Sequence, residues 1–157
     1  MRETERIADQ LKRAFHGDAW HGPSVREALE GVTAEIAFAR PLPNAHTIWE
    51  LVHHIAAWAD IVRRRIEREN VKVTGALDFP PVTDPSETGW QQSLKRLETA
   101  ESELRKTALQ IPESRLEEPA VEGGSLVYVQ LHGVVQHSLY HAGQIVLLKK
   151  ALQRNAG

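Results

Sequence analysis

The chain has no cysteine among its 157 residues, which excludes disulfide bonds, thiolate metal sites and a cysteine nucleophile. It also has neither a polybasic patch nor a long run of like charges, and its 19 basic and 21 acidic residues leave a formal net charge of -2. A nucleic-acid groove needs clustered lysine and arginine to neutralise phosphates. We therefore expect no nucleic-acid partner.

Long apolar runs are missing as well. No stretch reaches the length of about 18 apolar residues that spans a bilayer, and the charged residues 1–6 do not resemble a secretory signal. We therefore expect no membrane partner and a cytoplasmic location. With 41% hydrophobic and 25% charged residues, the composition is that of a soluble globular protein. The length predicts one domain over residues 1–157.

Histidine is the residue type that stands out, with eight copies. A neutral imidazole is the commonest metal ligand in proteins, and it titrates near physiological pH. The histidines are spread along the chain rather than gathered in a tag, at positions 16, 21, 46, 53, 54, 132, 137 and 141. The histidine content therefore suggests a metal site as a hypothesis, and the spacing of these residues indicates which of them could share an ion.

Proline and glycine divide the chain into helical segments with no convincing strand. We expect helices over residues 3–16, 24–31, 33–40, 47–70, 84–110 and 125–152. Capping boxes mark two of the starts, Ser24 with Glu27 and Thr47 with Glu50. At a third start, Asp84 is the expected N-cap, followed by proline and glutamate in the first turn. The four longer segments predict an all-α four-helix bundle, whose connection order the sequence leaves open.

Helical geometry separates the two adjacent histidines of the 47–70 segment. Its apolar stripe is centred between Leu51, Ile55 and Val62. With a turn of about 100° per residue, His54 lies roughly 90° from that centre and His53 roughly 170° from it. His54 is then the histidine able to point into the bundle, and His53 is expected to face water.

The last predicted helix is apolar nearly all round, which indicates burial on more than one side. Within it, Gln130, His137, His141 and Gln144 fall in one sector roughly 60° wide. Buried polar groups are costly unless they find partners. Two imidazoles four residues apart project together and can share a metal ion. Hydrogen-bonded core histidines are the alternative, but the single polar sector, with His54 on another long helix, favours a ligand set.

Several further residues are candidates for supporting roles. Glu50 could orient a histidine ligand or simply complete the cap at Thr47. Gln144 could bond substrate or a metal-bound water, and His21 or His46 could carry protons or be ordinary loop histidines. The tryptophans are interpreted as core residues or as walls of a pocket: Trp20, Trp49, Trp58 and Trp90.

The stretches IWELVHHIAAW (residues 48–58) and HSLYHAGQI (residues 137–145) resemble the DinB/YfiT-like superfamily, and AWHGPS (residues 19–24) and Trp90 fit the same pattern. The resemblance covers nearly the whole chain. It implies a four-helix bundle, often a homodimer, whose metal is bound by three histidines that map to His54, His137 and His141. It implies nickel, zinc, iron or manganese as the metal, and we expect nickel or zinc.

Three functions follow as hypotheses. The first is a metal-dependent enzyme, a transferase or hydrolase, because three histidines leave coordination positions open for water or substrate. The resemblance implies a small-molecule substrate and a low-molecular-weight thiol, since some relatives transfer such thiols onto electrophiles. The second is a metal-binding protein without turnover, and the third is a helical homodimer with structural histidines. A homodimer is also expected because the last helix is apolar in more directions than one bundle contact can cover.

Overall fold

The computed structural model describes residues 1–155 and contains seven α-helices and one short 3₁₀ helix in that range. The long helices are α1 (Glu3–His16), α4 (Ile48–Ile66), α6 (Glu87–Gln110) and α7 (Val127–Asn155). The short ones are α2 (Val25–Ala28), α3 (Ala34–Phe38), α5 (Gly75–Asp78) and the 3₁₀ helix Glu113–Glu117. Within the described residues there is one isolated bridge, Pro119 to Leu126, and no strand, so the all-α prediction is confirmed.

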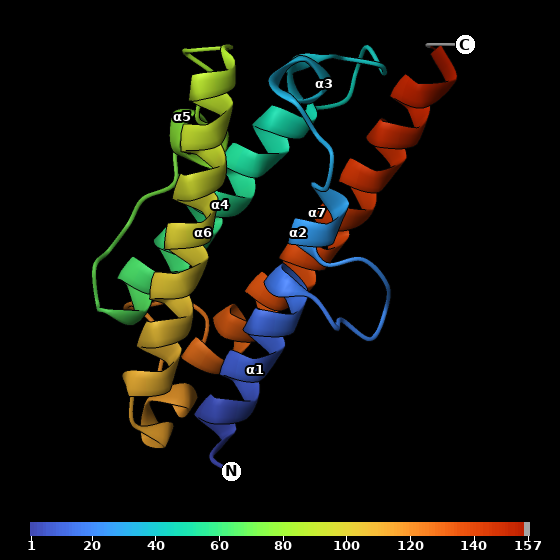
Figure 1. The fold of residues 1–157 in the computed structure, drawn as a ribbon. Helices are drawn as coiled ribbons and strands as arrows, with labels where there is room; N and C mark the ends of the chain where they lie inside the picture. The colour runs from blue at the N-terminus through green and yellow to red at the C-terminus, as the bar shows by residue number, and fades with distance from the viewer. Residues whose placement is uncertain (156–157) are drawn as a thin grey trace.

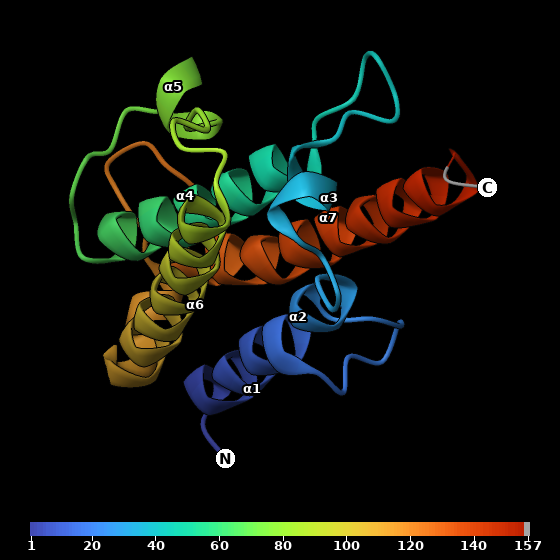
Figure 2. The same cartoon turned by 45° about the horizontal axis from the view of Figure 1, so that its top comes forward.

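The long helices pack with α1 and α7 running in one direction and α4 and α6 in the other (Figure 1). The segment 67–86 between α4 and α6 therefore returns along α4, and it carries α5 with it (Figure 2). This crossover answers the question of connection order that the sequence left open. The crossover brings α5 against α4. On another side, α4 packs alongside α7. Over residues 1–155, no helix combines the length and apolarity needed to cross a lipid bilayer.

Two tryptophans anchor the larger core. Trp49 of α4 and Trp90 of α6 are fully buried and meet edge to face, with ring centroids 5.1 Å apart. Trp90 Nε1 donates to the Val32 carbonyl and Trp49 Nε1 donates to Ser93 Oγ, each at 2.9 Å. Trp20, by contrast, is fully exposed. The buried indoles thus join α4 and α6 to the segment before α3.

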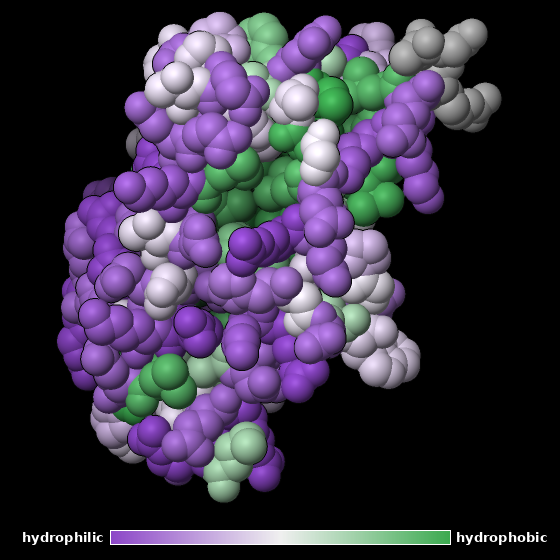
Figure 3. Space-filling model, viewed as in Figure 1, coloured by the Kyte–Doolittle hydropathy of each residue, from purple (hydrophilic) through white to green (hydrophobic). Residues whose placement is uncertain are grey.

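The outer edge of this core opens as a hollow between α6 and the α1–α2 segment (Figure 3). Phe15, Leu29 and Leu94 line it and pack on the same core cluster. Charged side chains of both signs stand around them, including Arg26 and Glu98. The apolar surface at this point is therefore continuous with the interior rather than a separate patch.

Both predicted capping boxes are confirmed. The backbone N–H of Ser24 donates to Glu27 at 2.8 Å, and that of Thr47 donates to Glu50 at 2.8 Å, with the hydroxyls accepting in return. These reciprocal bonds satisfy N–H groups that the first helical turn leaves free. The starts of α2 and α4 are thus fixed by local chemistry, which is why the sequence located them.

The predicted start of α6 is wrong by two residues. Ser86, not Asp84, is the N-cap, and its Oγ accepts the N–H of Gly89 at 3.2 Å. Asp84 Oδ1 instead accepts the N–H of Ser86 at 3.0 Å, which makes a turn ahead of the helix. Glu87 is therefore the first residue of the helix rather than the third, and its carboxylate accepts the N–H of Ala34 at the start of α3 (3.0 Å).

The loop expected over residues 71–83 contains α5, which the sequence analysis missed. Thr74 caps it by accepting the N–H of Leu77 at 3.3 Å. A helix of four residues has no apolar period to detect, so this threonine was its only local signal. The short helix ends at Asp78, which contacts His54 and Trp58 of α4.

A buried carboxyl group lies where α6 packs on α1. Glu101 is buried, and neither of its carboxylate oxygens has a hydrogen-bond partner. His16 Nε2 lies 3.7 Å from Glu101 Oε2, and burial lowers the pKa of this imidazole, so the pair supplies little positive charge. Burial raises the pKa of Glu101 to about 7. This helix contact therefore holds a group that is costly to ionise.

Candidate metal centre

Three histidines converge between α4 and α7. His54 lies in the middle of α4, and His137 and His141 lie one turn apart on α7. The Nε2 atom of His137 is 2.9 Å from His54 Nε2 and 3.1 Å from His141 Nε2. One ligand nitrogen from each residue lies within 4.8 Å of the others. The structure therefore brings together the three residues predicted as ligands, and His54 points inward as the face geometry required.

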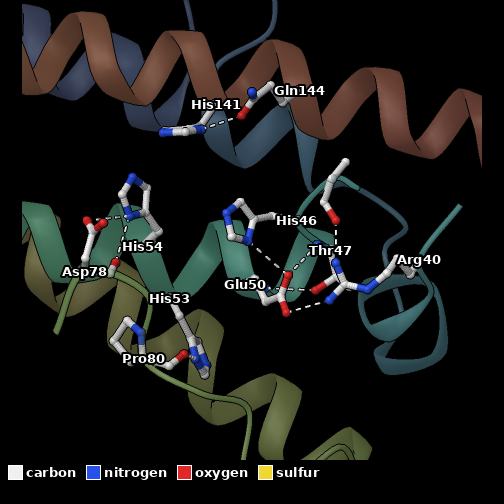
Figure 4. Close-up of polar contacts among 11 residues, drawn as sticks. Arg40, His46, Thr47, Glu50, His53, His54, Asp78, Pro80, His141 and Gln144 are labelled. Atoms are coloured by element: carbon white, nitrogen blue, oxygen red, sulfur yellow. Dashed lines mark hydrogen bonds and ion pairs between the residues drawn. The ribbon is translucent and has the colours of Figure 1, made fainter. Parts of the chain in front are cut away.

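Hydrogen bonds at the far side of two rings fix their tautomers. His54 Nδ1 donates to the Asp78 carbonyl at 2.7 Å, and His141 Nδ1 donates to Gln144 Oε1 at 2.6 Å (Figure 4). Because both partners are acceptors, each Nδ1 carries the hydrogen and each Nε2 carries a lone pair. One hydrogen on His137 Nε2 cannot bond both lone pairs well, whereas a cation interacts with all three nitrogens. The donor set thus fits a divalent transition metal.

The electrostatics favour the neutral form of the two histidine rings on α7. Burial lowers the pKa of His137 to about 4, and the neighbouring His141 and His54 add to the effect. Burial also lowers the pKa of His141, although its bond to Gln144 opposes the shift. Metal binding requires the neutral imidazole. The surroundings therefore hold both α7 histidines in the form that binds metal at neutral pH.

Asp78, the last residue of α5, and Phe79, directly after it, hold His54 in place, and the sequence analysis missed both. Asp78 Oδ1 accepts the indole N–H of Trp58 at 2.7 Å and lies 3.2 Å from His54 Nδ1. The Phe79 ring stacks on His54 with centroids 4.0 Å apart, and its other face stacks on His46 at 3.9 Å. Outer partners of this kind set ligand orientation in metal sites. No periodic pattern could link the end of a four-residue helix to a histidine 24 positions earlier.

Glu50 and His21 do not contact the clustered histidines. Glu50 completes the Thr47 cap and pairs with Arg40 Nη2 at 2.7 Å and with His46 Nδ1 at 3.2 Å (Figure 4). The cap interpretation of Glu50 is therefore correct, and its link to the site runs through His46 and the Phe79 stack. His21 is exposed in the loop between α1 and α2, outside the cluster.

The expectation that His53 faces water is wrong. Its Nδ1 donates to the Pro80 carbonyl at 2.9 Å, and its Nε2 lies 2.8 Å from Ser93 Oγ, which α6 supplies. Burial lowers the pKa of this imidazole. The helical wheel placed His53 opposite the apolar stripe correctly, but the returning segment and α6 cover that face. His53 thus fastens the same segment that orients His54.

A cavity of about 500 Å³ opens beside the cluster, and His137 is part of its wall. Its other walls come from α4, from α7 and from the segment 121–125 before α7. Trp58, Val62 and Val134 give it apolar surface. Trp58 is therefore the one tryptophan of the four that lines this cavity. The volume lies in the range of small-molecule sites.

Comparisons with known proteins agree with this fold. No curated protein matches the chain. A crystal structure of a conserved protein from Enterococcus faecalis is similar in fold, with a TM-score of 0.68, 18% identity and coverage of 96% of this chain and 97% of that one. The family model described as the DinB superfamily matches residues 19–145, a range that contains all three clustered histidines. The resemblance seen in the sequence is confirmed: the chain belongs to the DinB superfamily.

Proposed function

We propose that this protein binds one divalent transition ion through His54, His137 and His141 and acts as a metal-dependent enzyme on a low-molecular-weight thiol. The observation that carries the proposal is the convergence of three Nε2 atoms while two of the Nδ1 atoms are bonded to acceptors. Nickel or zinc suits three imidazoles best, with iron and manganese as alternatives. A cytoplasmic location belongs to the proposal, because that compartment keeps thiols reduced.

Three protein ligands favour a reactive site over a structural one, because structural zinc sites use four. A divalent ion held there would supply a lowered pKa for a bound water or thiol. The chain's own residues would orient the ligands and admit the substrate. Asp78 and Gln144 hold the rings of His54 and His141, and the cavity beside His137 gives a substrate access. A metal-binding protein without turnover and a purely structural histidine cluster are the alternatives.

Cobalt substitution tests this proposal. Metal-free protein loaded with Co²⁺ should develop a new thiolate-to-cobalt absorption band when 2-mercaptoethanol is added, and the band should saturate. Ethylene glycol, which carries a hydroxyl in place of the thiol, is the control and should leave the spectrum unchanged. Cobalt retention with no response to the thiol would favour the metal-binding protein without turnover. Failure to bind cobalt at all would favour structural histidines.

We also propose that the protein is a homodimer that pairs along α7. Val129, Tyr140 and Leu147 are 51%, 65% and 60% exposed. These three positions lie within about 20° of one another on the helix, so they form one apolar stripe on α7. Two copies related by a two-fold axis could cover such a stripe reciprocally.

The expected result is a dimer by light scattering at tens of micromolar, and a monomer for Leu147→Glu. Leu109→Glu is the matched control, since Leu109 is an exposed leucine on α6, away from the stripe. A monomeric wild type would contradict the dimer. A Leu147→Glu variant that stays dimeric would place the interface elsewhere.

A further inference from the structure

Arg65 differs from its two neighbours in the arginine run at the end of α4. Arg63 and Arg64 each pair with carboxylates on neighbouring turns, at distances down to 2.7 Å for Arg63. Within residues 1–155, Arg65 has no carboxylate within 4.0 Å. Its one hydrogen bond runs from Nη2 to the Val71 carbonyl at 3.1 Å, and its Nε is buried without a partner. The guanidinium thus lacks an anion.

Arg65 lines the same cavity as His137. Its guanidinium carbon lies 5.8 Å from the centroid of the Trp58 ring, a cation–π contact that holds it against the cavity wall. Val62 and Val134 supply apolar surface to the same space. One side of the cavity therefore offers a positive charge beside an aromatic and aliphatic wall, with the histidine cluster adjoining.

Besides Arg65 and His137, three polar residues border the cavity: Glu122, Ser125 and Gln130. Gln130 Oε1 is buried without a hydrogen-bond partner, in the polar sector of α7 that also holds His137. Glu122 is exposed in the segment before α7, where water screens its charge. Arg65 is only half-buried, but its Nε is out of contact with water. Water therefore screens the positive charge of Arg65 less than the negative charge of Glu122.

We propose that this cavity binds a small organic carboxylate whose anionic group pairs with Arg65 and whose apolar body packs on Trp58, Val62 and Val134. The planar guanidinium matches a carboxylate in geometry and charge. Such a ligand supplies the anion that Arg65 lacks and extends toward His137. The inference rests on the proposed function, since it names the class of the second substrate at the same metal centre.

Benzoate is a suitable probe, with benzamide and benzylammonium as neutral and cationic compounds carrying the same ring. Calorimetry on zinc-loaded and metal-free protein should show benzoate binding in both. Arg65→Gln should weaken it about 10- to 100-fold, the range expected for a lost charge-assisted hydrogen bond. The affinity of Arg65→Lys for benzoate should lie between those of the wild type and Arg65→Gln. Arg64→Gln, the matched control in the same run of arginines, should bind as the wild type does, and benzamide and benzylammonium should bind more weakly than benzoate.

Benzoate binding that is equal in the wild type and Arg65→Gln overturns the proposal, as does no binding to the wild type at millimolar concentration. Binding that requires zinc and ignores Arg65 also overturns it, because the carboxylate then interacts with the metal alone. Failure of the metal centre is seen separately, as absence of zinc uptake, and the metal-free titrations still decide the role of Arg65. If Arg65→Gln does not fold, Arg65→Lys decides by whether its preference for benzoate over benzamide shrinks.

Discussion

Replacement of His141 by alanine should abolish metal retention and leave the helical fold intact. The change removes one of the three converging Nε2 atoms, and two imidazoles hold a transition ion far more weakly. Loss of an outer partner already costs 10–100-fold in metal affinity, so loss of a ligand should cost more than about 100-fold. The fold should tolerate it, because Gln144, the partner left behind, is partly exposed and can turn to water.

Calorimetric titration of the metal-free proteins with zinc and nickel, together with their thermal midpoints, measures both effects. His21→Ala is the control, since His21 is an exposed loop histidine and should not affect binding. Unchanged affinity in His141→Ala would remove this residue from the ligand set. If the metal-free variant is less stable than the metal-free wild type by about 1–3 kcal/mol, His141 is a structural histidine, because its removal leaves buried partners without hydrogen bonds.

Replacement of Glu101 by glutamine should stabilise the protein at alkaline pH. Folding raises the pKa of this carboxyl from an ordinary value of 4.5 to about 7. The folded state then holds the proton more tightly than the unfolded chain, so the free energy of unfolding of the wild type should fall as pH rises from about 4.5 to 7. Glutamine cannot ionise, and its buried amide offsets part of the gain. We expect a net increase on the order of 2 kcal/mol at pH 8.

Urea unfolding at pH 5 and pH 8 measures this difference. The variant and the wild type should have similar free energies of unfolding at pH 5, where Glu101 is protonated in the folded protein. At pH 8 the variant should have the higher value. Glu103→Gln is the matched control, because Glu103 is an exposed acid on the same helix. A variant less stable than the wild type at pH 8 would show that the Glu101 carboxylate stabilises the α1–α6 contact in its charged form.

The parts of the site that helical geometry governs could be predicted from the sequence. The spacing of His137 and His141 and the angle of His54 from the apolar stripe depend only on local helix geometry. The starts of α2 and α4 depend on residues three positions apart. Each of these predictions needed no knowledge of how distant segments meet.

The remaining features depend on the return of residues 67–86 along α4. That path places the Asp78 carbonyl on His54, the Phe79 ring between His54 and His46, and the Pro80 carbonyl on His53. The error at His53 has the same cause, because a helical wheel takes the face opposite the apolar stripe to be open to water. Contacts between a loop and a helix carry no sequence period, so only the folded chain could show them.

The metal content of the wild-type protein, purified without added metal, tests the central claim most directly. Elemental analysis should find one divalent transition ion per chain, and none in His54→Ala purified in the same way. A wild type that contains no such ion, and takes up neither zinc nor nickel when they are supplied, would contradict the claim that His54, His137 and His141 form a metal centre.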